Sequence, residues 1–296
     1  MTFQTNQAAG FPGWAEIEAT EGVYDWSKVD AQIAAKPPGK LMGLTIMLLP
    51  DPPAWLASKG VTIYSVPHGT HGNVPWFNPW DTVAQPLMLD FMAKICQRYD
   101  GKVDYIVIGG VGMVTESYLP DLTIIGETAT QAISDWSGST AKVIDTYAAN
   151  LKTTPFIMAC AIPISSNTDA TNALGTVVRA KLAQYPLFGV ANYGLNPSTD
   201  YTKGFLPFVL VNEASTSGHA AGFQCSTANG AGTNFQGSLT AALNCGAKYV
   251  EAWSGDASNT ANADAIAAFN AQVNVIKAIK TVTKPAQSAR KHHKKR

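Results

Sequence analysis

The chain has 296 residues, of which 46% are hydrophobic and only 14% are charged, so it can bury a large core. This composition excludes a disordered chain and argues against a nucleic-acid-binding protein, which would carry more charge and fewer aromatic residues. Lys and Arg together number 21, as do Asp and Glu, so no polyanionic or polycationic partner is predicted.

Apolar runs that fit buried β-strands alternate with helical segments along most of the chain. The runs lie at Thr2–Asn6, which has the poorest pattern, and at Leu41–Leu49, Val103–Gly110, Phe156–Ile162, Leu187–Tyr193, Ala220–Cys225 and Tyr249–Trp253. Nearly continuous apolar runs are typical of parallel strands that are buried on both faces. The alternation therefore predicts a parallel sheet in which helices connect the strands.

Helical periodicity fills the gaps between these runs. Asp25 is expected to cap a helix that carries Val29 and Ile33 on one face. Further helices are expected at Gln85–Tyr99, Ala141–Leu151, Asn172–Gln184 and Ala261–Val282. Two long insertions, Pro50–Val83 and Glu116–Ser139, follow the C-terminal ends of strands, where α/β barrels build their active sites.

These elements predict one α/β domain over residues 1–284, a (β/α)8 TIM-type barrel whose first strand or strands are degenerate or missing. The alternative is a doubly wound open sheet, which would carry a G-x-G-x-x-G phosphate loop after its first strand. Gly109-Gly110-Val111-Gly112 follows a strand but lacks that spacing. Residues 285–296 form a basic tail that is expected to be solvated and disordered.

The compartment is left open by the sequence, although a composition rich in Ala, Thr, Asn, Ser and Gly is common in exported proteins. Met1–Gly10 is polar and lacks the apolar region of a signal peptide, and no apolar run is long enough to span a membrane. The four cysteines lack metal-binding spacing. Cys225 and Cys245 are expected near opposite ends of a barrel, so a disulfide between them is not predicted.

Acidic residues at the ends of buried strands are the most informative feature. Glu116 follows the run Val103–Gly110, and Glu251 lies within an otherwise apolar strand. An apolar setting disfavours the charged form of a carboxyl group, as a general acid requires, and paired carboxylates are the standard means of cleaving glycosidic bonds. Glu213 is a third acidic residue, but it is expected on a solvated helix face, while Asp256 is expected to bind a sugar hydroxyl.

Aromatic residues gather in the segments expected at the same end of the barrel. Sugar rings present apolar C–H faces that stack on such side chains, and we expect Trp55, Trp76, Tyr193 and Trp253 to form a sugar platform. A second interpretation is that they pack the long insertions as small cores. The other members of this group are Tyr64, Phe77, Trp80, Tyr118 and Trp136.

Two further kinds of site find little support. His68 and His71 share a segment with Asp51 and Asp81, but without the fixed spacing of a metal site, so neither a metal nor another cofactor is predicted. No G-x-S-x-G motif is present, which argues against a serine hydrolase of the α/β-hydrolase type.

Three segments resemble clan A glycoside hydrolases, the group of beta-galactosidase-like and xylanase-like barrels. Trp14–Asp30, WAEIEATEGVYDWSKVD, resembles their W-x-x-I-E-P-x-E-G-x-Y-D-W-x-x-L-D segment, and Pro52–Leu56 resembles the P-x-W-L that follows their third strand. Arg98–Gly101 and Val103–Gly110 resemble their R-Y helix end and their fourth strand. The resemblance extends over about residues 14–120.

The resemblance implies particular catalytic positions. The acid/base Glu of this clan ends the fourth strand, and Glu116 matches it, with Thr115 where the clan usually has Asn. The nucleophile of the clan ends the seventh strand. Counting strands onward from Glu116 places Gln224 at that position and Glu251 on the eighth strand. If the fourth and eighth strands face each other, the two carboxylates are separated enough to hold a water molecule, which would favour inversion.

Two functions follow as hypotheses. The first is a glycosidase with Glu116 as general acid, Glu251 as nucleophile or base, and Trp55, Trp76, Tyr193, Gln224, Trp253 and Asp256 as substrate contacts. The second is a catalytically inactive barrel that binds carbohydrate or serves a larger surface assembly. The partner expected in either case is a carbohydrate, with no nucleic acid and no membrane span.

Overall fold

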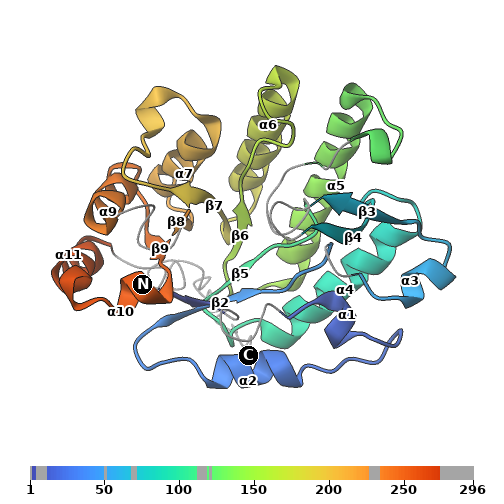
Figure 1. The fold of residues 1–296 in the computed structure, drawn as a ribbon, viewed down its shortest axis with the longest axis horizontal. Helices are drawn as coiled ribbons and strands as arrows, with labels where there is room; N and C mark the ends of the chain where they lie inside the picture. Colours follow the sequence, from blue (N-terminus) through green and yellow to red (C-terminus); the bar gives the residue numbers. More distant parts are fainter. Residues whose placement is uncertain are drawn as a thin grey trace, which may run out of the picture.

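Seven parallel strands form the central sheet of the computed structural model, which describes residues 2–4, 12–49, 52–67, 72–111, 119, 122–226 and 234–273. Their order is β1 (Thr2–Gln4), β2 (Leu41–Thr45), β5 (Tyr105–Val107), β6 (Phe156–Ala159), β7 (Phe188–Leu195), β8 (Ala221–Cys225) and β9 (Tyr249–Glu251). The outermost strands β1 and β9 lie beside each other, so the sheet curls into a barrel-like shape (Figure 1).

Helices surround this sheet, as Figure 1 shows. The longer ones are α2 (Ser27–Ala34), α4 (Ala84–Tyr99), α5 (Ala129–Asn150), α6 (Thr168–Gln184), α7 (Leu206–Thr216), α9 (Phe235–Asn244) and α11 (Ala263–Gln272). Short helices α1 (Trp14–Ile17), α3 (Trp55–Ser58) and α10 (Ser254–Ser258) follow β1, β2 and β9. The predicted TIM-barrel-like α/β class is confirmed, and the described residues supply one strand fewer than the eight of a closed barrel.

Every predicted apolar run overlaps one of the seven sheet strands, including the weakest run at Thr2–Asn6, which contains β1. The predicted helices are present too, although α11 is described only to Gln272, and the basic tail 285–296 lies outside the described residues. Asp25 accepts a hydrogen bond from the backbone N–H of Ser27 (2.9 Å), but the helix cap itself is Trp26. The division into one domain and a tail therefore stays a prediction.

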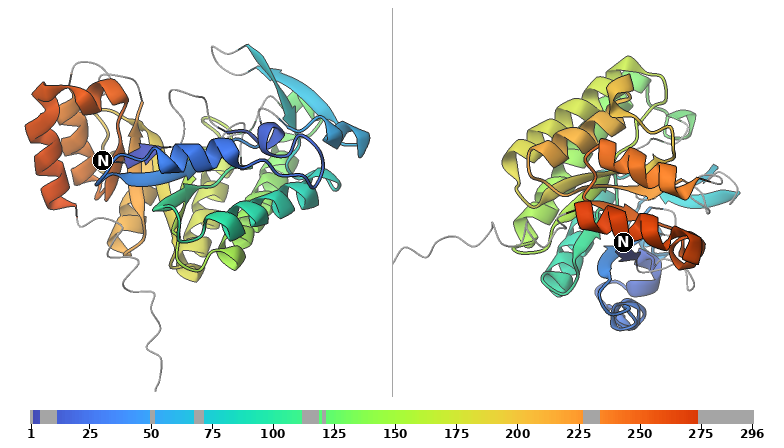
Figure 2. Two further views of the ribbon diagram at one scale, coloured as in Figure 1. Left: turned by 90° about the horizontal axis from the view of Figure 1, so that it is seen from below. Right: turned by 90° about the vertical axis from the view of Figure 1, so that its left-hand side faces the viewer.

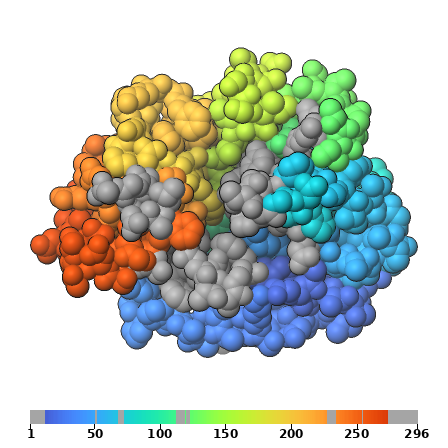
Figure 3. Space-filling view, viewed as in Figure 1, coloured from blue at the N-terminus to red at the C-terminus, as the bar shows by residue number. Residues whose placement is uncertain are grey.

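The insertion Pro50–Val83 contains an antiparallel hairpin that the sequence did not predict. Its strands are β3 (Ile63–Pro67) and β4 (Asn73–Phe77). The hairpin projects from the rim of the barrel (Figure 2), and in Figure 3 it reaches the same face as the segment around α10. Because both segments follow the C-terminal ends of parallel strands, this face is the one on which barrel enzymes build their sites.

The second insertion, Glu116–Ser139, is shorter than expected because α5 begins at Ala129. Thr128 caps the helix, its hydroxyl accepting a hydrogen bond from the backbone N–H of Gln131. Trp136 therefore lies on a helix and not in a loop. It is buried, and its indole N–H donates to the Val111 carbonyl (2.8 Å), so it belongs to the core between α5 and the end of β5.

The apolar core has two parts because side chains of each strand alternate between two faces. The larger part lies between the sheet and the helices and includes Ile106, Phe156 and Phe223. The smaller part lies on the opposite face of the strands, inside the barrel. It consists of Tyr105, Val107, Ile157, Ala191, Ala220 and Tyr249, with Leu41 and Tyr193 packed against them.

Two tyrosines fill much of this interior, and each lies against a glycine of a neighbouring strand. A Cβ at Gly43 would lie 2.4 Å from the Tyr105 ring, and one at Gly222 would lie 2.3 Å from the Tyr249 ring. The tyrosine rings themselves pack together, with centroids 5.2 Å apart. Glycine is therefore required at both positions by the space that the rings occupy.

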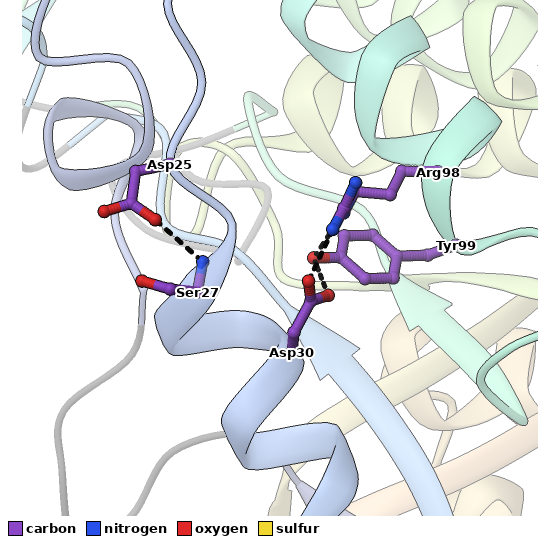
Figure 4. Close-up of polar contacts among 5 residues, drawn as sticks. All are labelled: Asp25, Ser27, Asp30, Arg98 and Tyr99. Atoms are coloured by element: carbon purple, nitrogen blue, oxygen red, sulfur yellow. Dashed lines mark hydrogen bonds and ion pairs between the residues drawn. The ribbon is translucent and has the colours of Figure 1, made fainter.

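The Arg98-Tyr99 end of α4 is tied to α2 through one carboxylate. Asp30 accepts hydrogen bonds from the Tyr99 hydroxyl (2.9 Å) and from the Arg98 guanidinium, as Figure 4 shows. The guanidinium also lies over the Trp26 ring, 5.6 Å from its centroid. Burial raises the pKa of Asp30, but these bonds outweigh it and hold the pKa below its usual value.

Asp100, the next residue, fastens the end of α4 to the chain that enters β6. Its carboxylate accepts hydrogen bonds from the backbone N–H groups of Lys152 (2.9 Å), Thr153 (3.0 Å) and Thr154 (2.9 Å). Burial raises the pKa of Asp100, but these donors outweigh it, so the pKa lies below its usual value. The ionised carboxylate therefore stabilises the fold.

We expect Gly222→Ala to lower the free energy of unfolding by about 1–3 kcal/mol, because its Cβ collides with the buried Tyr249 ring. Gly138→Ala is the matched control, since Gly138 lies in α5 with open space around it and should gain about 0.5–1 kcal/mol. Urea unfolding of both variants measures the difference. Equal stabilities would contradict the proposed packing of the interior.

We expect Asp100→Ala to lower the free energy of unfolding by about 1–2 kcal/mol at pH 7. The contribution of a carboxylate with a lowered pKa is present above its unfolded pKa of about 4 and is lost as the pH falls through the folded pKa. The difference from the wild type should therefore shrink between pH 5 and pH 2, as urea unfolding at several pH values would show. Asp90→Ala, at an exposed site on α4, is the control and should change stability little.

Candidate active site

Glu251 is the last residue of β9, and its side chain lies on the inner face of the barrel. Tyr249, two residues earlier, belongs to the interior group, while Val250 packs in the outer core. The period of two in a strand therefore places Glu251 inside, and it is only 4% exposed. A carboxylate at such a position needs hydrogen-bond donors from the protein, because burial removes those that water would supply.

Two donors reach this carboxylate from different strands. The Tyr105 hydroxyl donates to Oε1 of Glu251 at 2.5 Å, and the Gln224 side-chain amide donates to Oε2 at 3.3 Å. Gln224 lies on β8 directly opposite Glu251 in the strand register, whereas Tyr105 begins β5 on the other side of the interior. Hydrogen bonds to an ionised group are worth about 1.5–3 kcal/mol each, so the carboxylate is held in one orientation.

The charge of Glu251 acts on the groups around it. Burial raises the pKa of the Tyr249 hydroxyl well above its usual value, and the negative charge of Glu251 raises it further. Burial likewise raises the pKa of the Cys225 thiol to about 12, with further contributions from the charges of Asp256 and Glu251. Asp256 is 3% exposed in the first turn of α10, so two buried carboxylates lie close to the same thiol.

Trp253 completes this group at the ends of β8 and β9. Its indole N–H donates to the Cys225 carbonyl (3.0 Å), and its half-buried ring lies at the start of α10. Tyr193 lies further round the barrel on β7, half-buried against the interior group. Of the residues predicted for the site, the structure thus gathers Gln224, Glu251, Trp253 and Asp256.

The remaining predicted site residues lie apart from this group or outside the description. Glu116 falls in 112–118, which the structure does not describe, as does Tyr118. Trp55 is half-buried at the start of α3, where its indole N–H donates to the Glu18 carbonyl (2.8 Å). Trp76 is 1% exposed on β4 and belongs to the main apolar core, so it does not lie on the open face that a sugar platform needs.

Tyr105 is the site residue that sequence reasoning missed. Its position in an apolar run is typical of a core aromatic, and its ring is indeed fully buried. The alternation of side chains along the strand could have indicated its position. Tyr105 and Val107 share the inner face of β5, while Ile106 faces the helices. A buried tyrosine hydroxyl usually finds a hydrogen-bond partner, and for Tyr105 that partner is a carboxylate.

The Trp14–Asp30 motif builds the rim beside β1 and β2. Glu18 is 4% exposed, and its carboxylate accepts hydrogen bonds from the Trp14 indole (2.7 Å) and from the backbone N–H of Gly22 (2.8 Å). Trp14 stacks on Phe91 of α4 with ring centroids 5.1 Å apart, and Trp26 stacks on the same ring at 6.0 Å. The conspicuous acidic residue of this motif is therefore a structural clamp that holds the first turn after β1.

The third acidic residue and the cysteines have structural roles away from this group. Glu213 lies on α7 in an ion pair with Arg179 (2.8 Å), as its assignment to a helix face predicted. The four cysteines are buried free thiols. His68, His71 and Asp51 lie outside the described residues, within which no group of three His, Cys, Asp or Glu side chains could hold a metal ion. Within the same residues, no helix has the length and hydropathy to cross a bilayer.

Comparison with known proteins adds support for the fold. No family model matches the sequence, and a search of curated proteins finds no match. Among solved structures, xylanase 10B from Thermotoga petrophila in complex with xylobiose has a TM-score of 0.50 at 9% identity, over 81% of this chain and 70% of that one. The chain is therefore structurally similar to a GH10-type xylanase barrel, which confirms the predicted resemblance at the level of fold.

Two other structures show weaker likeness. A GH10 protein from Paenibacillus barcinonensis has a TM-score of 0.43 and 15% identity over 71% of this chain, which spans only 57% of that structure. A GH10 endoxylanase from a sugarcane soil metagenome has a TM-score of 0.46 and 10% identity, over 84% of this chain and 76% of that one.

Proposed function

We propose that this protein is a glycoside hydrolase that cleaves O-glycosidic bonds of an oligo- or polysaccharide with a pair of carboxylates. The observation that carries the proposal is Glu251, a buried carboxylate at the C-terminal end of a barrel strand, held by two donors. Catalytic residues of α/β barrels stand at this end of the strands. The similarity of fold to a xylanase makes a β-linked plant polysaccharide the first substrate class to test.

In this proposal Glu116 is the general acid and Glu251 is the opposing carboxylate. Glu116 protonates the glycosidic oxygen as the bond to the anomeric carbon breaks. In one route Glu251 attacks the anomeric carbon and forms a covalent glycosyl-enzyme, which water then hydrolyses as Glu116 takes its proton; in the other, Glu251 removes a proton from the water that attacks the anomeric carbon. Both routes give one reducing sugar and one alcohol, and they differ in the configuration of the released sugar.

The inverting route has the better support. In the sheet order, β6, β7 and β8 separate β5 from β9 on one side, and β2 and β1 separate them on the other. The Tyr105 side chain bridges these two walls by reaching Glu251. A general acid that follows β5 would thus face Glu251 across the width of the interior, which gives a water molecule room between the carboxyl groups.

The substrate contacts in this proposal surround the ends of β8 and β9. Trp253 and Tyr193 present partly exposed rings for stacking on a sugar, and Asp256 and Gln224 supply polar groups for its hydroxyls. Trp55 would extend the platform on the rim of β2, where part of its ring is exposed. Trp76 has no such part in the proposal, because its ring is buried.

A second function has one observation in its favour. Glu251 is 4% exposed beneath its two donors, which is a closed arrangement for a group that must reach a substrate. A barrel that binds carbohydrate without cleaving it could keep Glu251 as a structural link between opposite walls. The two functions differ in whether Glu251 is needed for turnover or only for stability.

The test is to assay the wild type, Glu116→Gln and Glu251→Gln against aryl glycosides, xylan and other polysaccharides. We expect cleavage by the wild type and a fall in kcat of at least about 10²-fold in each variant, since each removes a group that acts in the transition state. Glu213→Gln, which alters only an exposed ion pair on α7, is the matched control and should retain activity.

The configuration of the first sugar released, followed by NMR, should be inverted. Binding of a polysaccharide without cleavage by a well-folded wild type would favour the second function. Full activity in Glu251→Gln would show that the carboxylate of β9 is structural and would overturn the catalytic assignment.

A further inference from the structure

Tyr105 makes a short side-chain hydrogen bond in the interior, and nothing in the sequence motifs assigned it a role. Its hydroxyl lies 2.5 Å from Oε1 of Glu251, at the short end of the range for a hydrogen bond from a hydroxyl to a carboxylate. The bond from Gln224 to Oε2 is longer, at 3.3 Å. Of these two bonds, the one from Tyr105 is the shorter.

The surrounding residues confine the Tyr105 ring and direct its hydroxyl toward Glu251. The ring is fully buried, lies against Gly43 of β2, and packs on Tyr249 of β9 with centroids 5.2 Å apart. A side chain confined in this way loses little further freedom when it donates a hydrogen bond. The barrel interior thus holds the donor ready before any ligand binds.

We propose that Tyr105 is the positioning residue of the Glu251 site. Its hydroxyl holds Oε1 and thereby fixes the orientation in which the carboxylate meets the sugar or the water. A donor of this kind also favours the ionised carboxylate, the form that a nucleophile or base requires. This inference rests on the proposed glycosidase function and names the residue that gives Glu251 its orientation and its role.

Tyr249 provides a matched control within the same interior. It is the same residue type, its ring is also buried, and it packs against the Tyr105 ring. Its hydroxyl has no hydrogen-bond partner in the part of the chain that the structure describes. Removing that hydroxyl should therefore leave Glu251 in place, and it should raise the midpoint of thermal unfolding by relieving an unpaired buried group.

The first measurement needs no substrate. A short hydrogen bond between a hydroxyl and a carboxylate gives a strongly downfield, exchange-protected proton resonance, which we expect in the NMR spectrum of the wild type. The resonance should disappear in Tyr105→Phe and in Glu251→Gln and remain in Tyr249→Phe. A folded wild type without it, or a Tyr105→Phe variant that retains it, would overturn the assignment of the bond.

The second measurement is steady-state kinetics on the best substrate of the panel. We expect Tyr105→Phe to lower kcat about 10²-fold with little change in KM, because it misplaces a reacting oxygen without removing a sugar contact. Tyr249→Phe should keep the wild-type kcat. A Tyr105→Phe variant that is folded and has the wild-type kcat would show that Tyr105 is only a strut, and would leave the proposed function intact.

A third measurement applies if Tyr105→Phe does not fold. The amino acid 3-fluorotyrosine at position 105 keeps the ring and the hydroxyl while strengthening the donor. At position 105 it should move the downfield resonance and change kcat. At position 249 it should change neither. Equal effects at the two positions would overturn the inference. A wild type that shows the resonance but cleaves no glycoside would reject the proposed function, and with it the positioning role.

Discussion

The hydrogen bond between Tyr105 and Glu251 is the constraint on which the interior of this barrel depends. It joins β5 and β9, two strands that are distant in the sheet order, across the inside of the fold. Burying a carboxylate costs free energy unless the protein supplies hydrogen-bond donors. Gln224 donates from the neighbouring strand, whereas Tyr105 must reach Glu251 across the interior. The tyrosine that does so needs space, which Gly43 supplies on the neighbouring strand. The glycine in β2 thus makes room for the Tyr105 ring, and the ring in turn positions the hydroxyl that binds Glu251.

Glu18 is a second buried carboxylate, and its hydrogen bonds stabilise the rim of the barrel. Glu18 gathers the Trp14 indole and the Gly22 backbone, and the aromatic stack on Phe91 ties this turn to α4. Asp30 and Asp100 then fasten both sides of the end of α4. Glu18, Asp30 and Asp100, which lie in the segments that resemble clan A hydrolases, are therefore structural in this chain, whereas Glu251 lies at the candidate site.

Much of the fold could be predicted from the sequence because parallel strands buried on both faces leave continuous apolar runs. Even β1, with the poorest pattern, was found in this way. The β3–β4 hairpin was missed because its strands are short, partly exposed and interrupted by Pro75. The start of α5 was missed because Ser137, Gly138 and Ser139 are poor helix formers that interrupt the apolar pattern, although Ala132, Ile133 and Trp136 before them are buried.

The candidate site was predicted in part for equally physical reasons. Glu251 was recognisable because a charged residue within an apolar strand needs an explanation. Tyr105 was not, because a tyrosine in such a strand is typical of a core and its partner is 146 residues away in the sequence. Trp76 was misplaced on the platform because an aromatic residue in an unassigned insertion looks exposed until the hairpin that buries it is known.

The most direct test of this account is a crystal structure of the Glu251→Gln variant soaked with a xylo-oligosaccharide. The account predicts a sugar ring at the C-terminal ends of β8 and β9, in contact with side chain 251 and stacked on Trp253. A sugar bound elsewhere on the molecule, with side chain 251 still enclosed by Tyr105 and Gln224, would contradict it.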